Sequence, residues 1–171
     1  MQIRTVMPED HAYIVAVVDL WWGGRSMTLM LPKLFFVNFR DTSFIADADG
    51  MSVGFLIGFL SPALPDGAYI HFVGVHPDYR KRGVARALYE RFFRIAGDAG
   101  RHRVRCVTSP INSASLAFHG AMGFRPEGVT PTDDSVPVHR DYDGPGEDRV
   151  LLVKELETPL ERTTAGECLP S

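Results

Sequence analysis

The chain has 171 residues, of which 45% are hydrophobic and 23% are charged, a composition typical of one globular domain with a sizeable core. Its formal net charge is −3, so a nucleic-acid-binding surface is not expected. No apolar stretch approaches the length that spans a bilayer, and the N-terminus lacks the apolar core of a signal peptide. For the same reason no membrane partner is expected. The two cysteines, Cys106 and Cys168, are expected to be reduced thiols, which favours a cytoplasmic protein.

The N-terminal part predicts a short strand at 3–6 and a helix that ends at Gly23-Gly24. Apolar residues recur there at the spacing of one helix face: Ile14, Val17, Val18, Trp21 and Trp22. One of the two tryptophans is expected in the core. The alternative for Trp22, together with Arg25, is that they line a substrate pocket. A second helix is expected at 31–39.

The middle of the chain predicts a hairpin, a strand and a long helix. Residues 44–48 and 52–58 flank Asp49-Gly50, a pair that favours a type I′ turn because both positions tolerate positive φ. Residues 69–75 are β-branched and aromatic and should form a strand that Pro77 ends. The helix begins near Val84, and its apolar face comprises Val84, Leu88, Phe92, Ile95 and Ala96.

Between this strand and helix lies the run Arg80-Lys81-Arg82-Gly83-Val84-Ala85. The first amides of a helix have no partner within it and carry about half a positive charge. Gly83 and Ala85 leave the backbone accessible, so the run predicts a cradle for phosphate groups. It differs from both the dinucleotide fingerprint and the Gly-Lys-Ser/Thr phosphate loop. The alternative is a solvated charge run with a turn at Gly83.

The C-terminal half predicts a strand at 103–108, a helix from Asn112 or Ser113 to about 122, and a last strand at 149–156. The order of elements predicts an α/β protein with three layers, an α/β/α sandwich. Residues 1–156 are expected to form a single domain, and 157–171 a C-terminal tail. The polar segment 138–146 is either a long surface turn or a functional insertion.

Three motifs together resemble the GNAT superfamily of acyl-CoA-dependent N-acyltransferases. They are Val75-His76-Pro77, the run from Arg80 to Ala85, and Asn112 to His119 followed by Gly123-Phe124. The resemblance implies a mixed, mostly antiparallel sheet in which strand 69–75 is bulged and splays from strand 103–108. The bulge is expected at Gly74, since glycine inside a strand often marks one.

The resemblance also implies acetyl-CoA as cosubstrate, no metal and a possible homodimer. The residues expected to bind the cofactor are Val73, Gly74, Val75, Arg80, Lys81, Arg82, Gly83, Val84, Ala85, Arg86, Asn112 and His119. For Asn112 a helix N-cap is an equally complete explanation.

Aminolysis of a thioester needs a donor to the developing oxyanion, a base for the amine and an acid for the thiolate. The backbone N–H of Val73 is the expected oxyanion donor. His119 stands where the family usually has a tyrosine, and it is the candidate acid or sulfur-orienting group. His71 is the candidate base. The alternative is that His71 is a core histidine. A water, or no group at all, would then serve as the base.

The expected reaction is transfer of an acetyl group to the primary amine of a small molecule in a ternary complex. Trp22, Arg25, Asp141 and Tyr142 are the candidate acceptor contacts, and Asp133, Asp134 and Asp143 would suit a cationic amine. The alternatives are acetylation of a protein or peptide, and a CoA-binding sensor domain without catalysis.

Overall fold

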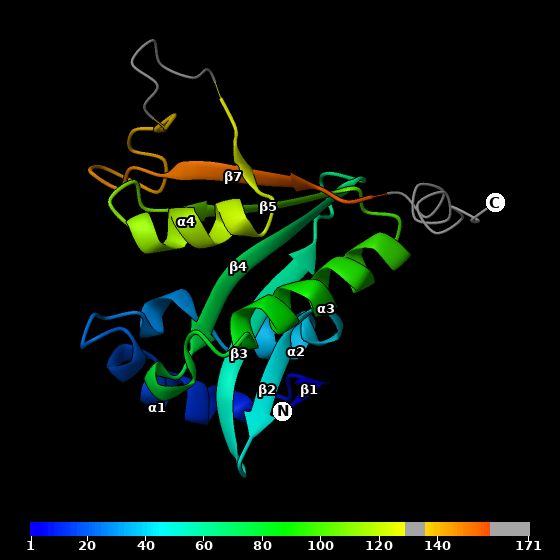
Figure 1. Cartoon of the computed structure of the whole chain (residues 1–171), viewed down its shortest axis with the longest axis vertical. Helices are drawn as coiled ribbons and strands as arrows, with labels where there is room; N and C mark the ends of the chain where they lie inside the picture. Colours follow the sequence, from blue (N-terminus) through cyan, green and yellow to red (C-terminus); the bar gives the residue numbers. More distant parts are fainter. Residues whose placement is uncertain (129–135, 158–171) are drawn as a thin grey trace, which may run out of the picture. The chain divides into compact units, whose positions relative to one another are not determined.

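The computed structural model describes residues 1–128 and 136–157, and it divides into two compact units (Figure 1). The first unit comprises Met1–Leu60 and Tyr69–Ile95; the second comprises Ser61–Ala68 and the described residues from Ala96 onward. Residues 158–171, most of the predicted tail, lie outside the description. No helix within the described ranges is long and apolar enough to cross a membrane.

The strands of the first unit are β1 (Gln2–Thr5), β2 (Phe44–Ala48), β3 (Met51–Leu60) and the part of β4 (Gly67–Val75) that begins at Tyr69, in the order β1-β2-β3-β4. β2 pairs antiparallel with both β1 and β3. The turn between β2 and β3 has φ of 53° at Asp49 and 78° at Gly50. Both values fit the predicted type I′ turn, so the hairpin is confirmed.

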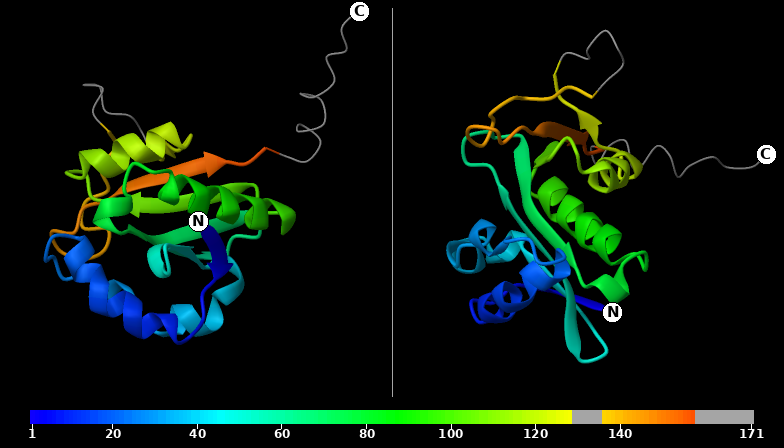
Figure 2. Two further views of the ribbon diagram at one scale, coloured as in Figure 1. Left: turned by 60° about the horizontal axis from the view of Figure 1, so that its bottom comes forward. Right: turned by 90° about the vertical axis from the view of Figure 1, so that its left-hand side faces the viewer.

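The helices of this unit cover both faces of its strands. α1 (Asp10–Trp21) and α2 (Leu34–Asn38) lie on one side of β3 and β4, and α3 (Val84–Asp98) lies on the other (Figure 2, right). Three 3₁₀ turns complete the unit: η1 (Thr28–Met30), η2 (Arg40–Thr42) and η3 (Pro77–Tyr79). The second helix is shorter than predicted: Pro32 disfavours a helical backbone at Leu31, and the helix begins only at Leu34.

Alternation along β3 explains the three layers. Phe55 and Ile57 are fully buried in one core with Ile14 and Val18 of α1. The glycines that flank these two residues face α3: a Cβ added at Gly54 would lie 2.7 Å from Val84 Cγ1, and one added at Gly58 would lie 2.5 Å from Phe92 Cε2. The two glycines therefore let α3 approach the strand closely. The predicted α/β/α layering is confirmed for this unit.

The second unit contains β5 (Arg103–Thr108), α4 (Ser113–Ala121), β6 (Arg125–Pro126) and β7 (Val150–Glu155). β7 pairs antiparallel with both β5 and β6. The side chains of Val104, Cys106 and Thr108 are buried, and the Thr108 hydroxyl lies 2.9 Å from the hydroxyl of Ser115 on α4.

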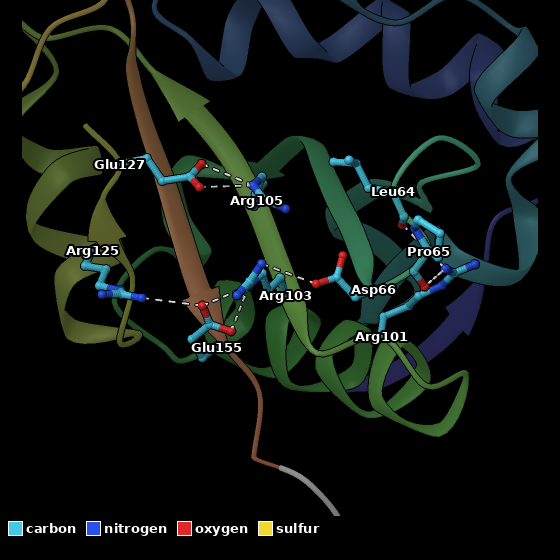
Figure 3. A network of polar contacts seen from close by, with 9 residues as sticks. All are labelled: Leu64, Pro65, Asp66, Arg101, Arg103, Arg105, Arg125, Glu127 and Glu155. Atoms are coloured by element: carbon cyan, nitrogen blue, oxygen red, sulfur yellow. Dashed lines mark hydrogen bonds and ion pairs between the residues drawn. The ribbon is translucent and has the colours of Figure 1, made fainter. Parts of the chain in front are cut away.

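The opposite side chains of β5 form a ladder of ion pairs (Figure 3). Arg103 contacts Glu155 at 3.1 Å and Asp66 at 3.4 Å, and Arg105 contacts Glu127 at 3.1 Å. Exposed pairs of this kind add little stability. They do match the register, in which Arg103 lies opposite Glu155, so a one-residue slip of β5 would place the arginines on the buried face.

Candidate active site

β4 has one more residue than β3 in the stretch from Tyr69 to Gly74. Phe59 of β3 faces Tyr69, with ring centroids 5.5 Å apart, and Phe55 lies against Gly74. The two phenylalanines are four positions apart along β3, whereas Tyr69 and Gly74 are five positions apart along β4. One residue of β4 is therefore unmatched, which defines a β-bulge.

The side chains locate this bulge. His71 stacks on Phe35 of α2 at 4.5 Å, and Phe72, the next residue, stacks on Phe55 at 5.7 Å. Both rings thus lie on the face that α1 and α2 cover, although successive side chains of a regular strand point to opposite faces. The prediction that Gly74 itself forms the bulge is wrong. Gly74 is needed for packing, since a Cβ there would lie 2.3 Å from Phe55 Cε1.

His71 is held by Met30 and Phe35, through contacts that no sequence pattern predicted. Its Nε2 lies 2.6 Å from the carbonyl oxygen of Met30. Because a carbonyl only accepts, Nε2 carries the proton, and in the neutral ring Nδ1 is then the basic nitrogen. No sequence signal marks Met30 or Phe35 for this task, since both contacts join segments about forty residues apart.

The two adjacent tryptophans have different environments. Trp21 is buried and lies 5.5 Å from the ring of His76. Trp22 is half-buried, lies 5.1 Å from the ring of Phe72, and would be 3.0 Å from a Cβ at Gly74. The expectation of one core tryptophan is therefore confirmed. Trp22 lies beside the part of β4 that follows the bulge, whereas Arg25 is exposed beyond the turn.

Asp19 fixes the segment that follows this turn. Its Oδ1 accepts hydrogen bonds from the backbone N–H of Met27 at 2.7 Å and of Thr28 at 3.0 Å, and from the Thr28 hydroxyl at 3.0 Å. These backbone bonds, Met27 first, lower the pKa of Asp19. An acid in the last turn of a helix opposes the macrodipole. That conflict was a sequence signal that could have identified Asp19.

The loop between β4 and α3 has the backbone of an anion site. Lys81 and Gly83 have φ of 60° and 81°, and nothing lies within 4 Å of a Cβ built on Gly83. The first helical bond runs from Ala87 N–H to Gly83 O at 3.0 Å. The amides of Val84, Ala85 and Arg86 precede that bond and so have no acceptor within the helix. This geometry fits a phosphate group.

The arginines of the loop have separate contacts. Arg80 donates through Nε to the carbonyl of Val75 at 3.3 Å, and through its terminal nitrogen to the carbonyl of Trp21. Arg82 places its guanidinium carbon 5.1 Å from the centre of the Tyr79 ring. Arg86 is exposed and lies 4.0 Å from Glu90. Arg80 thus ties the loop to the ends of β4 and α1, while Arg82 and Arg86 remain at the surface.

Asn112 and His119 lie in the second unit, at the start and in the last turn of α4. Asn112 Oδ1 accepts from the Ser115 N–H at 3.1 Å, which confirms the N-cap. His119 is buried, and its Nδ1 donates to the Ser115 carbonyl at 2.7 Å. Burial lowers the pKa of His119, and the bond to Ser115 opposes that shift in part. The neutral ring is therefore favoured, with its proton on Nδ1.

The segment around Asp141 is a turn held by its own polar groups. His139 and Arg149 form a bridge with two backbone bonds of 2.8 and 3.0 Å. Asp141 donates its N–H to Asp148 at 2.9 Å and accepts from the Gly146 N–H at 2.6 Å. Asp143 accepts from Arg149 Nε at 2.6 Å. These contacts favour the surface-turn interpretation. Tyr142 is 49% exposed, and Asp133 and Asp134 lie outside the described residues.

Residues 8–124 match the model of the Acetyltransferase (GNAT) family. The match covers more than half of the chain, so the chain belongs to this family. The resemblance inferred from the motifs is thereby confirmed.

Two relatives act on different amines according to their names. L-2,4-diaminobutyric acid acetyltransferase of Nocardia farcinica is 35% identical over 88 residues, covering 52% of this chain and 46% of the relative. Aminoglycoside N(6')-acetyltransferase type 1 of Salmonella typhimurium is 33% identical over 88 residues, covering 48% of this chain and 61% of the relative. The matched part of the chain thus spans about half of the length of these relatives.

A solved structure extends the likeness to the whole chain. The crystal structure of Chaetomium thermophilum Naa20 in complex with a bisubstrate analogue superposes with a TM-score of 0.73 at 22% identity, covering 100% of this chain and 93% of that chain. The α/β fold expected from the sequence is confirmed.

Proposed function

We propose that the protein is an N-acetyltransferase that moves the acetyl group of acetyl-CoA to the primary amine of a small molecule by direct attack in a ternary complex. The observation that carries the proposal is the loop at the start of α3. Its backbone is open at Gly83, and the first amides of the helix have no acceptor within it. Three exposed cations, Lys81, Arg82 and Arg86, belong to the same stretch.

In this proposal the amides of Val84, Ala85 and Arg86 hold the pyrophosphate beside the open backbone of Gly83. The side chains of Lys81, Arg82 and Arg86 add positive charge. Arg80 keeps the loop in place through the carbonyls of Val75 and Trp21. The bulge before Phe72 supports a role for the backbone of Val73, Gly74 and Val75, because a bulge removes regular ladder partners from neighbouring amides and carbonyls. The Val73 N–H would donate to the oxyanion.

His71 is the proposed general base. The bond from Nε2–H to Met30 leaves Nδ1 as the nitrogen that takes the proton from the amine as the new N–C bond forms. The stack on Phe35 fixes the ring plane. We expect His71→Ala to lower kcat by about 10²- to 10⁴-fold, whereas His71→Gln, which keeps a donor for Met30, should retain the fold with the same loss of kcat.

His119 is proposed to protonate the thiolate as the C–S bond breaks, and Asn112 to contact the pantetheine arm besides capping α4. For His119 this role requires the imidazolium, with Nδ1–H still on Ser115 and the transferred proton on Nε2. A histidine whose pKa is lowered by burial is a stronger acid but is protonated less often. The His119→Ala variant should therefore lose turnover with little change in affinity for acetyl-CoA.

Trp22 supports an acceptor pocket on the α1 side of β4, because its ring rests on Phe72 beside Gly74. Arg25 and Tyr142 are exposed, and we propose them as further contacts of the acceptor. For Asp141 the bonds within its own turn support a structural role. The names of the two relatives support an acceptor that carries more than one amine, such as a diamine or a polyamine-like molecule. They do not single out one compound.

The test is thiol release from acetyl-CoA in the presence of diamino acids, aminoglycosides, polyamines, arylamines and short peptides. Release with one small-amine class supports the proposal and assigns the acceptor. Release with peptides alone would replace the acceptor class. Binding of acetyl-CoA without release from any amine would favour a sensor domain, and no binding would contradict the phosphate cradle.

A further inference from the structure

We infer that Tyr79 is a positioning residue that holds the Arg82 guanidinium ready for the phosphates of CoA, with Asp49 as its anchor. This inference rests on the proposed function and goes beyond it, since neither Tyr79 nor Asp49 belongs to the phosphate-binding run. The observation is a chain of contacts from the β2–β3 turn to the loop before α3.

Asp49, Tyr79 and Arg82 form a chain of two contacts within the first unit. Tyr79 donates its hydroxyl proton to Asp49 Oδ2 at 2.6 Å, and the Arg82 guanidinium lies over the Tyr79 ring at 5.1 Å. The anchor end is fixed because Asp49 occupies the first central position of the type I′ turn. The ring end is fixed because Tyr79 closes η3, where its N–H bonds to the His76 carbonyl at 2.9 Å.

The chemistry of this arrangement suits an arginine that must bind phosphate. A guanidinium over a ring face is attracted by the ring quadrupole, and none of its N–H donors is consumed. A direct pair with Asp49 would instead occupy the donors that a phosphate needs. The hydrogen bond from Tyr79 to a carboxylate also makes the phenol ring more electron-rich, and the same bond raises the pKa of Tyr79.

The benefit is preorganisation. A free arginine side chain loses rotamer freedom when it binds, and that loss weakens affinity. A side chain already held over Tyr79 loses less. The effect should appear in the affinity for donors that carry phosphates and not in the chemical step.

The experiment measures Kd and KM for acetyl-CoA in the wild type, Tyr79→Leu, Tyr79→Phe, Arg82→Gln and the double variant Tyr79→Leu/Arg82→Gln. Acetyl-pantetheine, which lacks all phosphates, is the second donor. Arg94→Gln is the matched control, because it removes one exposed cation from the other end of α3. Thermal unfolding of each variant checks the fold.

We expect Tyr79→Leu to weaken acetyl-CoA binding about two- to fivefold, the range of a surface cation–π contact, at unchanged kcat. Tyr79→Phe keeps the ring and should lie between the wild type and Tyr79→Leu. In the Arg82→Gln background Tyr79→Leu should have no further effect. Neither Tyr79 variant should change the KM for acetyl-pantetheine.

Full additivity of Tyr79→Leu and Arg82→Gln would overturn the inference, and so would an equal loss with acetyl-pantetheine. Unchanged acetyl-CoA affinity in Tyr79→Leu overturns the positioning role and leaves the proposed function standing. A wild-type protein that binds no acetyl-CoA overturns both.

Discussion

Replacing Gly74 with alanine tests the packing between β4 and the layer of α1. The added Cβ would lie 2.3 Å from Phe55 Cε1, 2.8 Å from Phe55 Cζ and 3.0 Å from Trp22 Cη2. Carbon atoms in contact prefer about 3.5–4.0 Å, so the Phe55 ring would have to retreat by roughly 1 Å. It has little room, because it is fully buried and stacked on Phe72.

Overpacking of this kind costs about 1–3 kcal/mol. For a chain of this size each kcal/mol lowers Tm by roughly 2–4 °C, so we expect Gly74→Ala to lower Tm by roughly 2–12 °C. Differential scanning calorimetry and urea unfolding would measure the loss. Phe55→Leu in the same background should restore part of it, because the smaller side chain leaves space for the new methyl group.

The control is the same substitution at Gly120, inside α4. Nothing lies within 4 Å of a Cβ there, so Gly120→Ala should stabilise the protein by about 0.5–1 kcal/mol. The packing account is refuted if Gly74→Ala unfolds at the wild-type temperature, or if Phe55→Leu and Gly74→Ala add in full.

Three further predictions concern single side chains. Cys106 is buried and burial raises the pKa of its thiol, so in a Cys168→Ser background it should not react with a disulfide reagent until the chain is unfolded; labelling of the folded protein would contradict its burial. Burial lowers the pKa of His119 below its usual 6.5, so the unfolded chain binds that proton more readily and the free energy of unfolding should fall as pH drops through about 6.5; a His119→Gln variant with the same pH dependence would show otherwise. Asn112→Ala should cost about 1 kcal/mol in urea unfolding, and Asn112→Asp should recover most of it; an unchanged midpoint for Asn112→Ala would rule out the cap.

The sequence predicted features that depend on local chemistry. Asp49-Gly50 forms the expected type I′ turn, because few residue pairs accept positive φ at both positions. The face of α3 followed from apolar spacing, with Val84, Leu88 and Phe92 buried. The cap at Asn112 was predicted on the same local grounds. In each case the residues that decide the structure lie within a few positions of one another.

Features that depend on distant contacts were misplaced or missed. Gly74 was taken for the bulge, but its lack of a side chain serves the rings of Phe55 and Trp22. The extra residue of β4 precedes Phe72, whose ring packs against Phe55 and Trp22. Likewise, the link from Arg80 to Trp21 joins residues 59 positions apart, and no local pattern indicates it.

The most direct test of the phosphate cradle is a pair of calorimetric titrations of the wild-type protein, one with acetyl-CoA and one with acetyl-pantetheine. Charge-assisted bonds to phosphate oxygens are strong, so acetyl-CoA should bind at least about tenfold more tightly, and the difference should shrink as salt is added. Equal affinity for the two donors, or no binding of acetyl-CoA, would contradict the assignment of residues 80–86 to the phosphates.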